Sequence, residues 1–314
     1  MTRGSRGLLV LISAVCLLLV GGPPGSGDED RGTLIPPNTF GADLEVRLKP
    51  LAERLGKPRS GEWRFEHPEE GPQSFDEYVY LKPVRKSGEL HTIYLCLLGD
   101  FSEAQQKVVD INREYLEIFF QTPVKILHRV PLAKIPASAR RKNPQEGHPQ
   151  ILTKFVLKDL LESQRPPDAL AYVAFTPTDL WTRDQGGQDW NFVFGEASLR
   201  ERVGVWSLAR YPDPARDLAS FQSCLKHTLG TASHEISHIL TMLHCTEYNC
   251  SMNGSNHLVE AESKPLHVCP PCFRKLAWNL QLDPVEYCRK LEDFSRRHGF
   301  PEEATYYGRA AEAL

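Results

Sequence analysis

The sequence predicts an α/β protein in which a mixed β-sheet is flanked by helices. Two observations carry this prediction: short apolar runs of strand length, and longer segments in which apolar residues recur at helical spacing. The expected strands are residues 91–98, 123–130, 169–175, 190–197 and 202–211, and the expected helices are 102–120, 150–164, 217–240 and 284–298. Alternation of strands with helices is typical of a sheet covered by helices.

Most of these elements have a local reason in the sequence. The run HTIYLCLL at 91–98 and the run ALAYVAF at 169–175 are apolar enough for buried strands. Ser102 is suited to cap the helix that follows it. Residues 131–149 are basic and contain prolines, so we expect a loop there.

The N-terminal residues resemble a secretory signal. Arg3 and Arg6 precede an apolar run from Leu8 to Val20, and small residues follow. The run has about 13 residues, which is short against the roughly 20 that span a bilayer as a helix. We expect residues 1–27 to be a cleaved signal peptide and the protein to be exported, either periplasmic or extracellular. The alternatives are an uncleaved anchor, which would put the protein on a membrane, or an ordinary buried helix.

The rest of the chain divides by composition. Residues 28–74 are rich in proline, glycine and charge, so we expect a linker or N-terminal extension with one short helix near 44–55. Residues 75–298 form the expected catalytic domain, with a Cys-rich segment at 245–272, and residues 299–314 are expected to be a polar tail. The 37 Lys and Arg residues against 40 Asp and Glu give a net charge of −3, which argues against a nucleic-acid partner.

The string HEISHILTMLH at 234–244 carries the chemistry. His234 and His238 are four residues apart, so they share one face of a helix and can grip one ion. Glu235 lies beside that face and can reach water at the metal without being a ligand. His244 can join only if the helix ends after Leu240 and the chain turns back. Three imidazoles and a water are a catalytic zinc arrangement; the alternative is a helix that happens to be rich in histidine.

A second set of candidate ligands consists of four cysteines. They are Cys245, Cys250, Cys269 and Cys272. Four thiolates make a closed, tetrahedral structural zinc site. Two disulfides are the alternative in an oxidising compartment. Cys96, Cys224 and Cys288 are expected to be buried apolar residues.

The string HEISHILTMLHCTEYNCSM, with CPPC at 269–272, closely resembles the archaemetzincins. Their signature is HExxHxxGxxH followed by Cys, a Cys five residues on, a Met two further and a distal CxxC. NFVFGEAS at 191–198 and GVWSLAR at 204–210 are also similar, and the resemblance covers about residues 75–295. It implies a metzincin-like fold with two zinc ions per chain, one catalytic and one structural. It also implies that Met252 lies beneath the catalytic zinc.

Two features depart from that family. Thr241 stands where the signature has Gly, at a sharp turn where a positive φ is easy for Gly and costly for a β-branched residue. Alternatively, the helix ends differently, with Thr241 at negative φ and its hydroxyl bonded one turn back. The second departure is the export signal, because the relatives that carry the resemblance are intracellular.

The motif predicts a monomeric zinc peptidase that acts on peptide or protein substrates. Glu235 would take a proton from a metal-activated water and deliver it to the leaving amine. Tyr248 and His257 are candidates for a second oxyanion stabiliser. Residues 190–195 are either an edge strand to which a peptide adds or an interior strand. The rival functions are a zinc hydrolase of a non-peptide amide and a zinc-retaining peptide-binding protein with little turnover.

Overall fold

The computed structural model describes residues 40–183, 186–198 and 201–314. The expected signal peptide at 1–27 and the first part of the expected linker lie outside the described residues. Among the described residues, no helix combines the length and the apolar character that crossing a bilayer requires.

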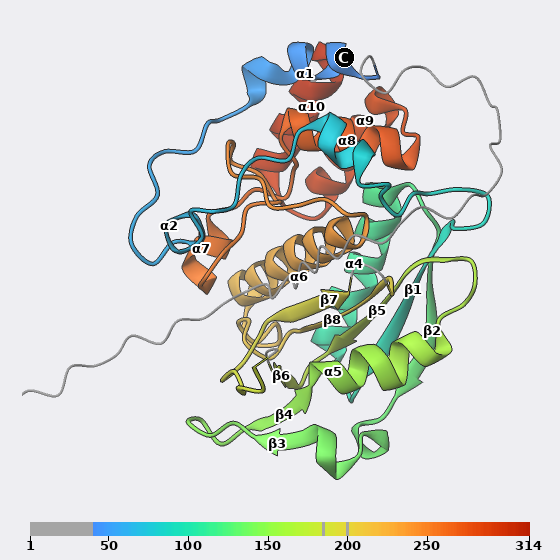
Figure 1. Cartoon of the computed structure of the whole chain (residues 1–314), viewed down its shortest axis with the longest axis vertical. Coiled ribbons are helices and arrows are strands. Elements are labelled where there is room, and N and C mark those ends of the chain that lie inside the picture. The colour runs from blue at the N-terminus through green and yellow to red at the C-terminus, as the bar shows by residue number, and fades with distance from the viewer. Residues whose placement is uncertain (1–39, 184–185, 199–200) are drawn as a thin grey trace, which may run out of the picture.

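A five-stranded mixed sheet forms the centre of one half of the molecule (Figure 1). Its strands, in spatial order, are β2 (Val124–Val130), β1 (Thr92–Leu98), β5 (Ala169–Thr176), β8 (Val203–Ser207) and β7 (Gly195–Ser198). The first four are parallel, and β7 runs antiparallel to β8 at the edge. All eight residues of β5 are buried because both faces of the sheet are covered. That burial explains why this strand is apolar throughout, and the predicted α/β class is confirmed.

Helices cover the two faces of this sheet. α4 (Glu103–Phe120) and α6 (Leu218–Ile239) share a core with one face. On the other face lies α5 (Thr153–Phe155), which continues as a π-helix (Val156–Leu161) and a 3₁₀ turn (Glu162–Gln164). Ser102 caps α4 in a reciprocal capping box, and Asp217 caps α6. The two predicted helices 102–120 and 217–240 are therefore confirmed.

A second, smaller sheet differs from the sequence prediction. It consists of β3 (Arg140–Lys142), β4 (Pro149–Leu152) and β6 (Asp179–Trp181). β3 lies in the segment 131–149 that was predicted to be a loop, together with 3₁₀ turns at Leu132–Lys134 and Ala137–Ala139. Residues 150–152 were predicted to be helical, but they pair with β6. Similarly, only the end of the predicted strand 190–197 belongs to β7, and Val193 instead bridges Leu180 of β6.

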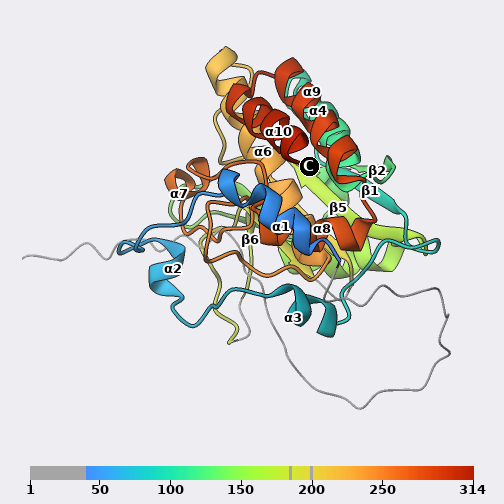
Figure 2. The ribbon, with the colours of Figure 1, turned by 90° about the horizontal axis from the view of Figure 1, so that it is seen from above.

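The other half of the molecule is helical and combines both ends of the described chain. Its elements are α1 (Ala42–Leu48), a 3₁₀ turn (Lys49–Leu51), α2 (Trp63–Glu66), α3 (Phe75–Tyr80), α7 (Leu258–Glu262), α8 (Pro270–Leu280), α9 (Pro284–Arg297) and α10 (Pro301–Ala313). Figures 1 and 2 both show α1 beside the C-terminal helices and α2 beside α7. Arg47 Nε donates to the Ala313 carbonyl (2.7 Å), and Trp63 N donates to Glu260 Oε1 (2.8 Å).

The two ends of the described chain differ in part from the expectation. The expected polar tail at 299–314 forms α10, which packs on α9 and buries Tyr307, Ala310 and Ala311. The described part of the expected linker contains α1, in agreement with the short helix expected near 44–55, and its Leu44 and Leu48 are buried in the main core. In both segments the few apolar residues sit on one helical face, and burying that face stabilises the helix.

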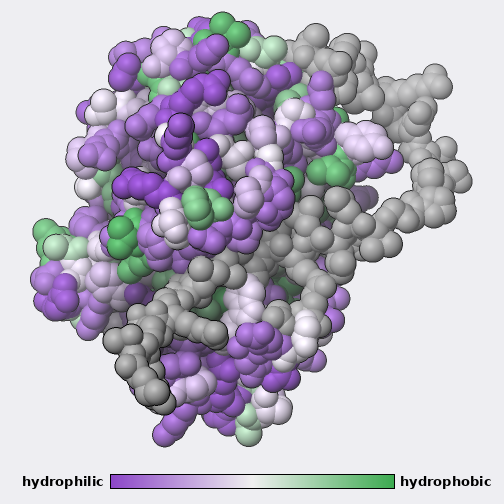
Figure 3. Space-filling view, turned by 60° about the vertical axis from the view of Figure 1, so that its left-hand side comes forward, coloured by the Kyte–Doolittle hydropathy of each residue, from purple (hydrophilic) through white to green (hydrophobic). Residues whose placement is uncertain are grey.

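Among the described residues, the large apolar side chains that are exposed are scattered over the surface. The face in Figure 3 is mostly hydrophilic, with separate hydrophobic spots. The most exposed large apolar residues in the described chain are Val46, Tyr80, Leu218 and Val259, which belong to different elements or loops. Isolated apolar residues of this kind are ordinary on a protein surface. The expected monomeric state stays a prediction.

Candidate active site and metal centres

The C-terminal end of α6 brings three histidines together. His234 and His238 lie on its last two turns, and His244 returns after the helix has ended. One nitrogen from each imidazole lies within 4.8 Å of the other two. All three residues are buried. The chain therefore turns back after Leu240, as the sequence required for a three-histidine site.

Thr241 makes this turn in the left-handed conformation, with a φ of 70°. Its N–H bonds the His238 carbonyl (2.7 Å), and the N–H of Met242 bonds the Ser237 carbonyl (3.1 Å). This pair of hydrogen bonds is the Schellman ending of a helix. The Thr241 hydroxyl accepts from the Val84 N–H (3.4 Å). The alternative with negative φ at Thr241 is therefore wrong, and Thr241 adopts the conformation that the signature Gly would take.

Gln73 of the N-terminal extension and Tyr78 of α3 hold this turn from outside. The Tyr78 hydroxyl donates to the Leu240 carbonyl (2.8 Å). The Gln73 amide donates to the Thr241 carbonyl (3.2 Å) and accepts from the Leu243 N–H (3.1 Å). Two of these contacts use carbonyls of the kind that the C-terminal end of a helix leaves unpaired, and the third uses the N–H of Leu243 just beyond the turn.

All three imidazoles are oriented in the same way. Each places Nδ1 against a hydrogen-bond acceptor and Nε2 towards the other two rings. The partners of Nδ1 are the Ser251 carbonyl for His234 (2.8 Å), the Met242 carbonyl for His238 (2.6 Å) and the Glu70 carboxylate for His244 (3.0 Å). An acceptor at Nδ1 fixes the proton there and leaves a lone pair on Nε2.

The inward-facing nitrogens fit a metal cation. Nε2 of His234 lies 2.9 Å from Nε2 of His238. Nε2 of His244 is buried and has no hydrogen-bond partner. Converging lone pairs repel one another, and an unpaired buried nitrogen is costly. A cation among them removes both penalties, and three imidazoles are a ligand set of catalytic zinc.

Burial also keeps two of these histidines neutral. It lowers the pKa of His238 to about 3 and that of His234 well below its ordinary value, with a further contribution from neighbouring positive charge. Neutral imidazoles are the form that binds a metal.

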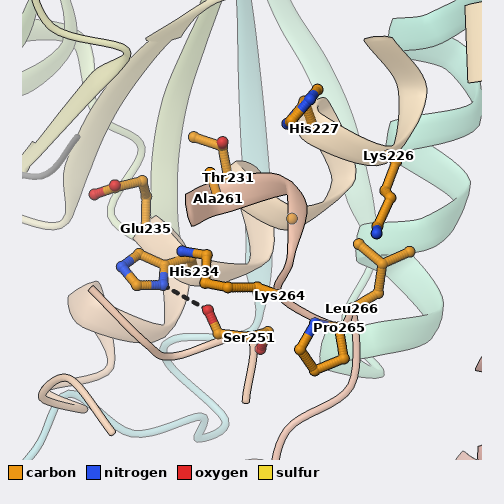
Figure 4. Close-up of a pocket in the computed structure, with 11 residues that line it drawn as sticks. Lys226, His227, Thr231, His234, Glu235, Ser251, Ala261, Lys264, Pro265 and Leu266 are labelled. Carbon is orange, nitrogen blue, oxygen red and sulfur yellow. Dashed lines mark hydrogen bonds between the residues drawn. The ribbon is translucent and has the colours of Figure 1, made fainter. Parts of the chain in front are cut away.

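Glu235 lies next to His234, at the edge of a small cavity (Figure 4). The cavity has about 30 Å³ of free volume, enough for about two water molecules. One wall is α6, and the other is formed by Ser251 and residues 261–266. Lys264 also lines it and donates to the Asn253 carbonyl (2.8 Å). Burial lowers the pKa of Lys264 to about 8, although the charge of Glu235 acts in the opposite direction.

The four cysteines form a second cluster, with their sulfurs within 4.8 Å of one another. Cys245 and Cys269 have sulfurs 3.6 Å apart, and the described cysteines form no disulfide. Cys250 Sγ accepts backbone N–H groups from Met252 (3.4 Å) and Cys269 (3.2 Å). Such donors stabilise a thiolate. This geometry favours one shared metal over two disulfides.

A short loop joins the two clusters. Cys245 directly follows His244, and its N–H bonds the carbonyl of the fully buried Met252 (2.8 Å). The Asn253 side chain accepts from the Cys250 N–H (2.9 Å) and donates to the Cys245 carbonyl (2.6 Å). Ser251, which precedes Met252, supplies the carbonyl that His234 Nδ1 contacts, so the loop that carries Met252 connects the cysteine cluster to His234.

The two candidates for a second oxyanion stabiliser have other contacts. The Tyr248 hydroxyl accepts from Arg54 (3.4 Å), and the Arg54 guanidinium lies over its ring. His257 caps α7 by accepting the Glu260 N–H at Nδ1 (3.1 Å). Neither belongs to the cluster of three histidines.

Sequence reasoning missed three residues that the first part of the described chain contributes to the site. They are Glu70, Gln73 and Tyr78, all in or beside a segment with the composition of a linker. Ser74 and Glu77 form a capping box at the start of α3, and this S-x-x-E spacing was the local signal for an ordered helix there. Nothing in the local sequence indicates that Glu70 would reach His244.

Comparison with known proteins places this geometry in context. Residues 104–278 match the sequence model of Peptidase family M54. The chain is 34% identical over 272 residues to archaemetzincin-2 of Rattus norvegicus, covering 77% of this chain and 74% of that protein. It is 34% identical over 138 residues to the archaemetzincin of Thermococcus kodakarensis, covering 42% of this chain and 69% of that protein. The solved structure of the Methanopyrus kandleri archaemetzincin aligns with a TM-score of 0.49 at 25% identity, covering 63% of this chain and 99% of that chain.

Proposed function

Since this chain belongs to peptidase family M54, the archaemetzincins, and is a zinc metallopeptidase, we propose that its three clustered histidines hold the catalytic zinc and that Glu235 is the general base. The observation that carries this proposal is the convergence of three imidazole nitrogens at the end of the helix in which the buried Glu235 directly follows His234. When bound, zinc supplies a Lewis acid that acidifies water and polarises the scissile carbonyl.

Two features of Glu235 support the proposed role in proton transfer. It neighbours His234 on α6, and it lines the cavity that has room for water. Its carboxylate would accept a proton from the attacking water and pass it to the nitrogen of the leaving amine. The side chain is buried, so electrostatic interactions with the reacting atoms are stronger than in bulk water.

We further propose that the four cysteines hold a second, structural zinc, which makes two zinc ions per chain. The close approach of their sulfurs and the N–H groups that point at Cys250 support this number. The cysteine zinc would connect the loop after His244 to the start of α8.

The substrate is proposed to be an extended peptide that pairs with β7. Of the residues 190–195 that were expected to form an edge or interior strand, only Gly195 belongs to β7. β7 is antiparallel to β8 and lies beside α6, and no described strand pairs with its outer edge. An unpaired edge can accept a further strand through main-chain hydrogen bonds. Export to the periplasm or the cell exterior is also a proposal, which rests on the sequence of residues 1–27 alone.

Thr241 was the reason for considering a zinc-binding protein without turnover. Because Thr241 adopts the left-handed conformation and the histidines still converge, it no longer favours that rival. Hydrolysis of a non-peptide amide uses the same chemistry and is separated from peptide hydrolysis by assaying peptide libraries against small amides.

The deciding experiment is Glu235→Gln, with Glu247→Gln as the control because Glu247 lies on the outer loop beside Arg54. We expect zinc content to stay constant while turnover of a peptide substrate falls by about two to four orders of magnitude, the usual scale of general base catalysis. The control should retain wild-type turnover. Wild-type turnover by Glu235→Gln would show that the assignment of Glu235 is wrong.

A further inference from the structure

The three histidines differ in what supports their outer nitrogen. His234 and His238 donate to backbone carbonyls of the segment that follows α6. His244 instead faces the carboxylate of Glu70, which is 174 residues away in the chain. Glu70 also lies outside residues 104–278, the part that matches the family model.

The contact between Glu70 and His244 is close and shielded. His244 Nδ1 lies 3.0 Å from Glu70 Oε2 and 3.3 Å from Oε1. The His244 side chain is 4% exposed, whereas that of Glu70 is 30% exposed. Trp63 Nε1 donates to the same Oε2 atom (2.7 Å). The carboxylate is therefore held by two donors, and it is more exposed to solvent than the histidine.

Trp63 is itself tightly placed. Its ring meets the His244 ring edge-to-face at 4.8 Å and stacks on His67 at 4.0 Å. Gly254, two residues after Met252, packs against the indole so closely that a Cβ there would lie 2.3 Å from it. The backbone N–H of Trp63 also donates to the side chain of Glu260 in the first turn of α7. These contacts leave Trp63, and with it the Glu70 carboxylate, little freedom to shift.

We propose that Glu70 is a positioning residue for the catalytic zinc: it fixes the ring and the tautomer of His244 and strengthens that ligand. This inference rests on the proposed role of His244 as a zinc ligand. A carboxylate that accepts the Nδ1 proton holds the lone pair on Nε2 and makes the imidazole a better electron donor. Its negative charge also offsets part of the positive charge that a divalent cation brings to three neutral imidazoles.

Through Glu70, the N-terminal extension would help to orient a ligand of the catalytic zinc. The HExxH motif and His244 supply the ligands, but the orientation of His244 depends on a segment near the other end of the chain. Loss of a hydrogen-bonded carboxylate behind a metal ligand typically weakens metal binding by about 10–100-fold. If the contact between Glu70 and His244 served only to hold the extension on the domain, its removal would lower stability without a specific loss of zinc affinity at the histidines.

The test compares Glu70→Gln and Glu70→Ala with Glu69→Gln in the full chain. Glu69 is the neighbouring carboxylate, its side chain is 70% exposed, and its Oε1 lies 3.4 Å from His67 Nδ1. Each protein is equilibrated over a series of zinc buffers, and bound zinc is measured by metal analysis. The thiolate-bound zinc serves as an internal reference because it should be unchanged in all variants.

We expect Glu69→Gln to match the wild type and Glu70→Ala to need about 10–100-fold more free zinc to fill the histidine site. Glu70→Gln should fall between them, because its amide oxygen still accepts the proton but carries no charge. Trp63→Phe, which removes the Nε1 donor, should give a smaller loss in the same direction. The melting temperature of protein lacking the catalytic zinc should be nearly the same in Glu70→Gln and Glu69→Gln, so that the difference appears only when zinc is added.

Histidine-site affinity within twofold of wild type in Glu70→Gln and Glu70→Ala would overturn the proposal. If Glu70→Ala does not fold, the comparison of Glu70→Gln with Glu69→Gln decides. Because the readout is bound zinc, a failure of the peptidase mechanism at Glu235 leaves this result unaffected. Absence of any zinc at the histidines of the wild type would instead overturn the ligand assignment and the role of Glu70 together.

Discussion

The two ligand clusters lie on either side of one peptide bond, yet they are built in opposite ways. The cysteine cluster is local: its four sulfurs come from residues 245–272, and its N–H donors come from the same segment. The histidine cluster depends on partners from separate parts of the chain, including Glu70, Gln73 and Tyr78. A site that must exchange ligands keeps one side accessible, whereas a structural site is closed.

This difference predicts an asymmetry between the two sites. Damage to the cysteine cluster should displace His244 and unfold the surrounding loop, because Cys245 directly follows that ligand. Damage around the histidines should lower zinc affinity and turnover while the cysteine cluster stays intact. The following predictions test this asymmetry.

The largest effect is expected for Cys250→Ser. Metal binding at a structural zinc site contributes directly to folding, on the order of 10 kcal/mol in small zinc domains. We expect loss of the structural zinc, a strong fall in melting temperature and loss of catalytic zinc as well. Cys288→Ser is the matched control, because Cys288 is buried but lies outside the cluster; it should cost only about 1–3 kcal/mol. An unchanged melt with two zinc ions in Cys250→Ser would reject the structural site.

Chelation of the wild-type protein should remove the two metals in order. The histidine zinc should leave first, with loss of turnover and a stability decrease of about 4 kcal/mol if zinc had been present at a thousand times its dissociation constant. Circular dichroism should still show the helices at that point. The cysteine zinc should leave only under conditions that unfold the chain. Metal analysis during chelation follows the two losses. Release of the cysteine zinc before the histidine zinc would contradict the proposed difference between the two sites.

Tyr78→Phe tests the external support of the helix end. The change leaves the Leu240 carbonyl without its donor and the Asn279 amide without one acceptor, both in a buried region. We expect a loss of about 1–3 kcal/mol in unfolding free energy and weaker binding of the catalytic zinc only. Tyr80→Phe is the control, since Tyr80 is 85% exposed and should change stability by less than about 0.5 kcal/mol. Equal effects of the two variants would refute the support role.

The smallest effect is expected for Thr241→Gly. Glycine would relieve the strain of a β-branched residue in the left-handed region, about 1–3 kcal/mol. Glycine also raises the entropy of the unfolded chain, which lowers the free energy of unfolding by up to about 1 kcal/mol. It removes the acceptor for the Val84 N–H as well. We expect a neutral to stabilising change, with zinc binding intact or tighter, in thermal melts and zinc competition. A clear loss of both would mean that the threonine side chain, rather than the backbone conformation, secures the turn.

The amino-acid sequence by itself determined the parts of this protein whose partners are close in the chain. The alternation of β1, α4, β5 and α6 followed from apolar periodicity and helix caps. His234, His238 and Glu235 were evident because their spacing matches one helical turn, and the cysteines because they occur as two close pairs. The archaemetzincin signature added the expectation of a fold and of zinc. Each of these signals is local, so no tertiary contact was needed to read it.

The tertiary structure alone decided the features that depend on distant pairing. The local sequence predicts a helix for residues 150–152, but in the structure they belong to β4, whose hydrogen-bond partners include β6. The polar composition of residues 299–314 gave no indication that Tyr307 would be buried against the preceding helix. Glu70 shows the same limit at the site. Its hydrogen bond to His244 spans 174 residues. The role of a carboxylate in a polar segment depends on the group that contacts it in the folded protein, and the local sequence does not specify that group.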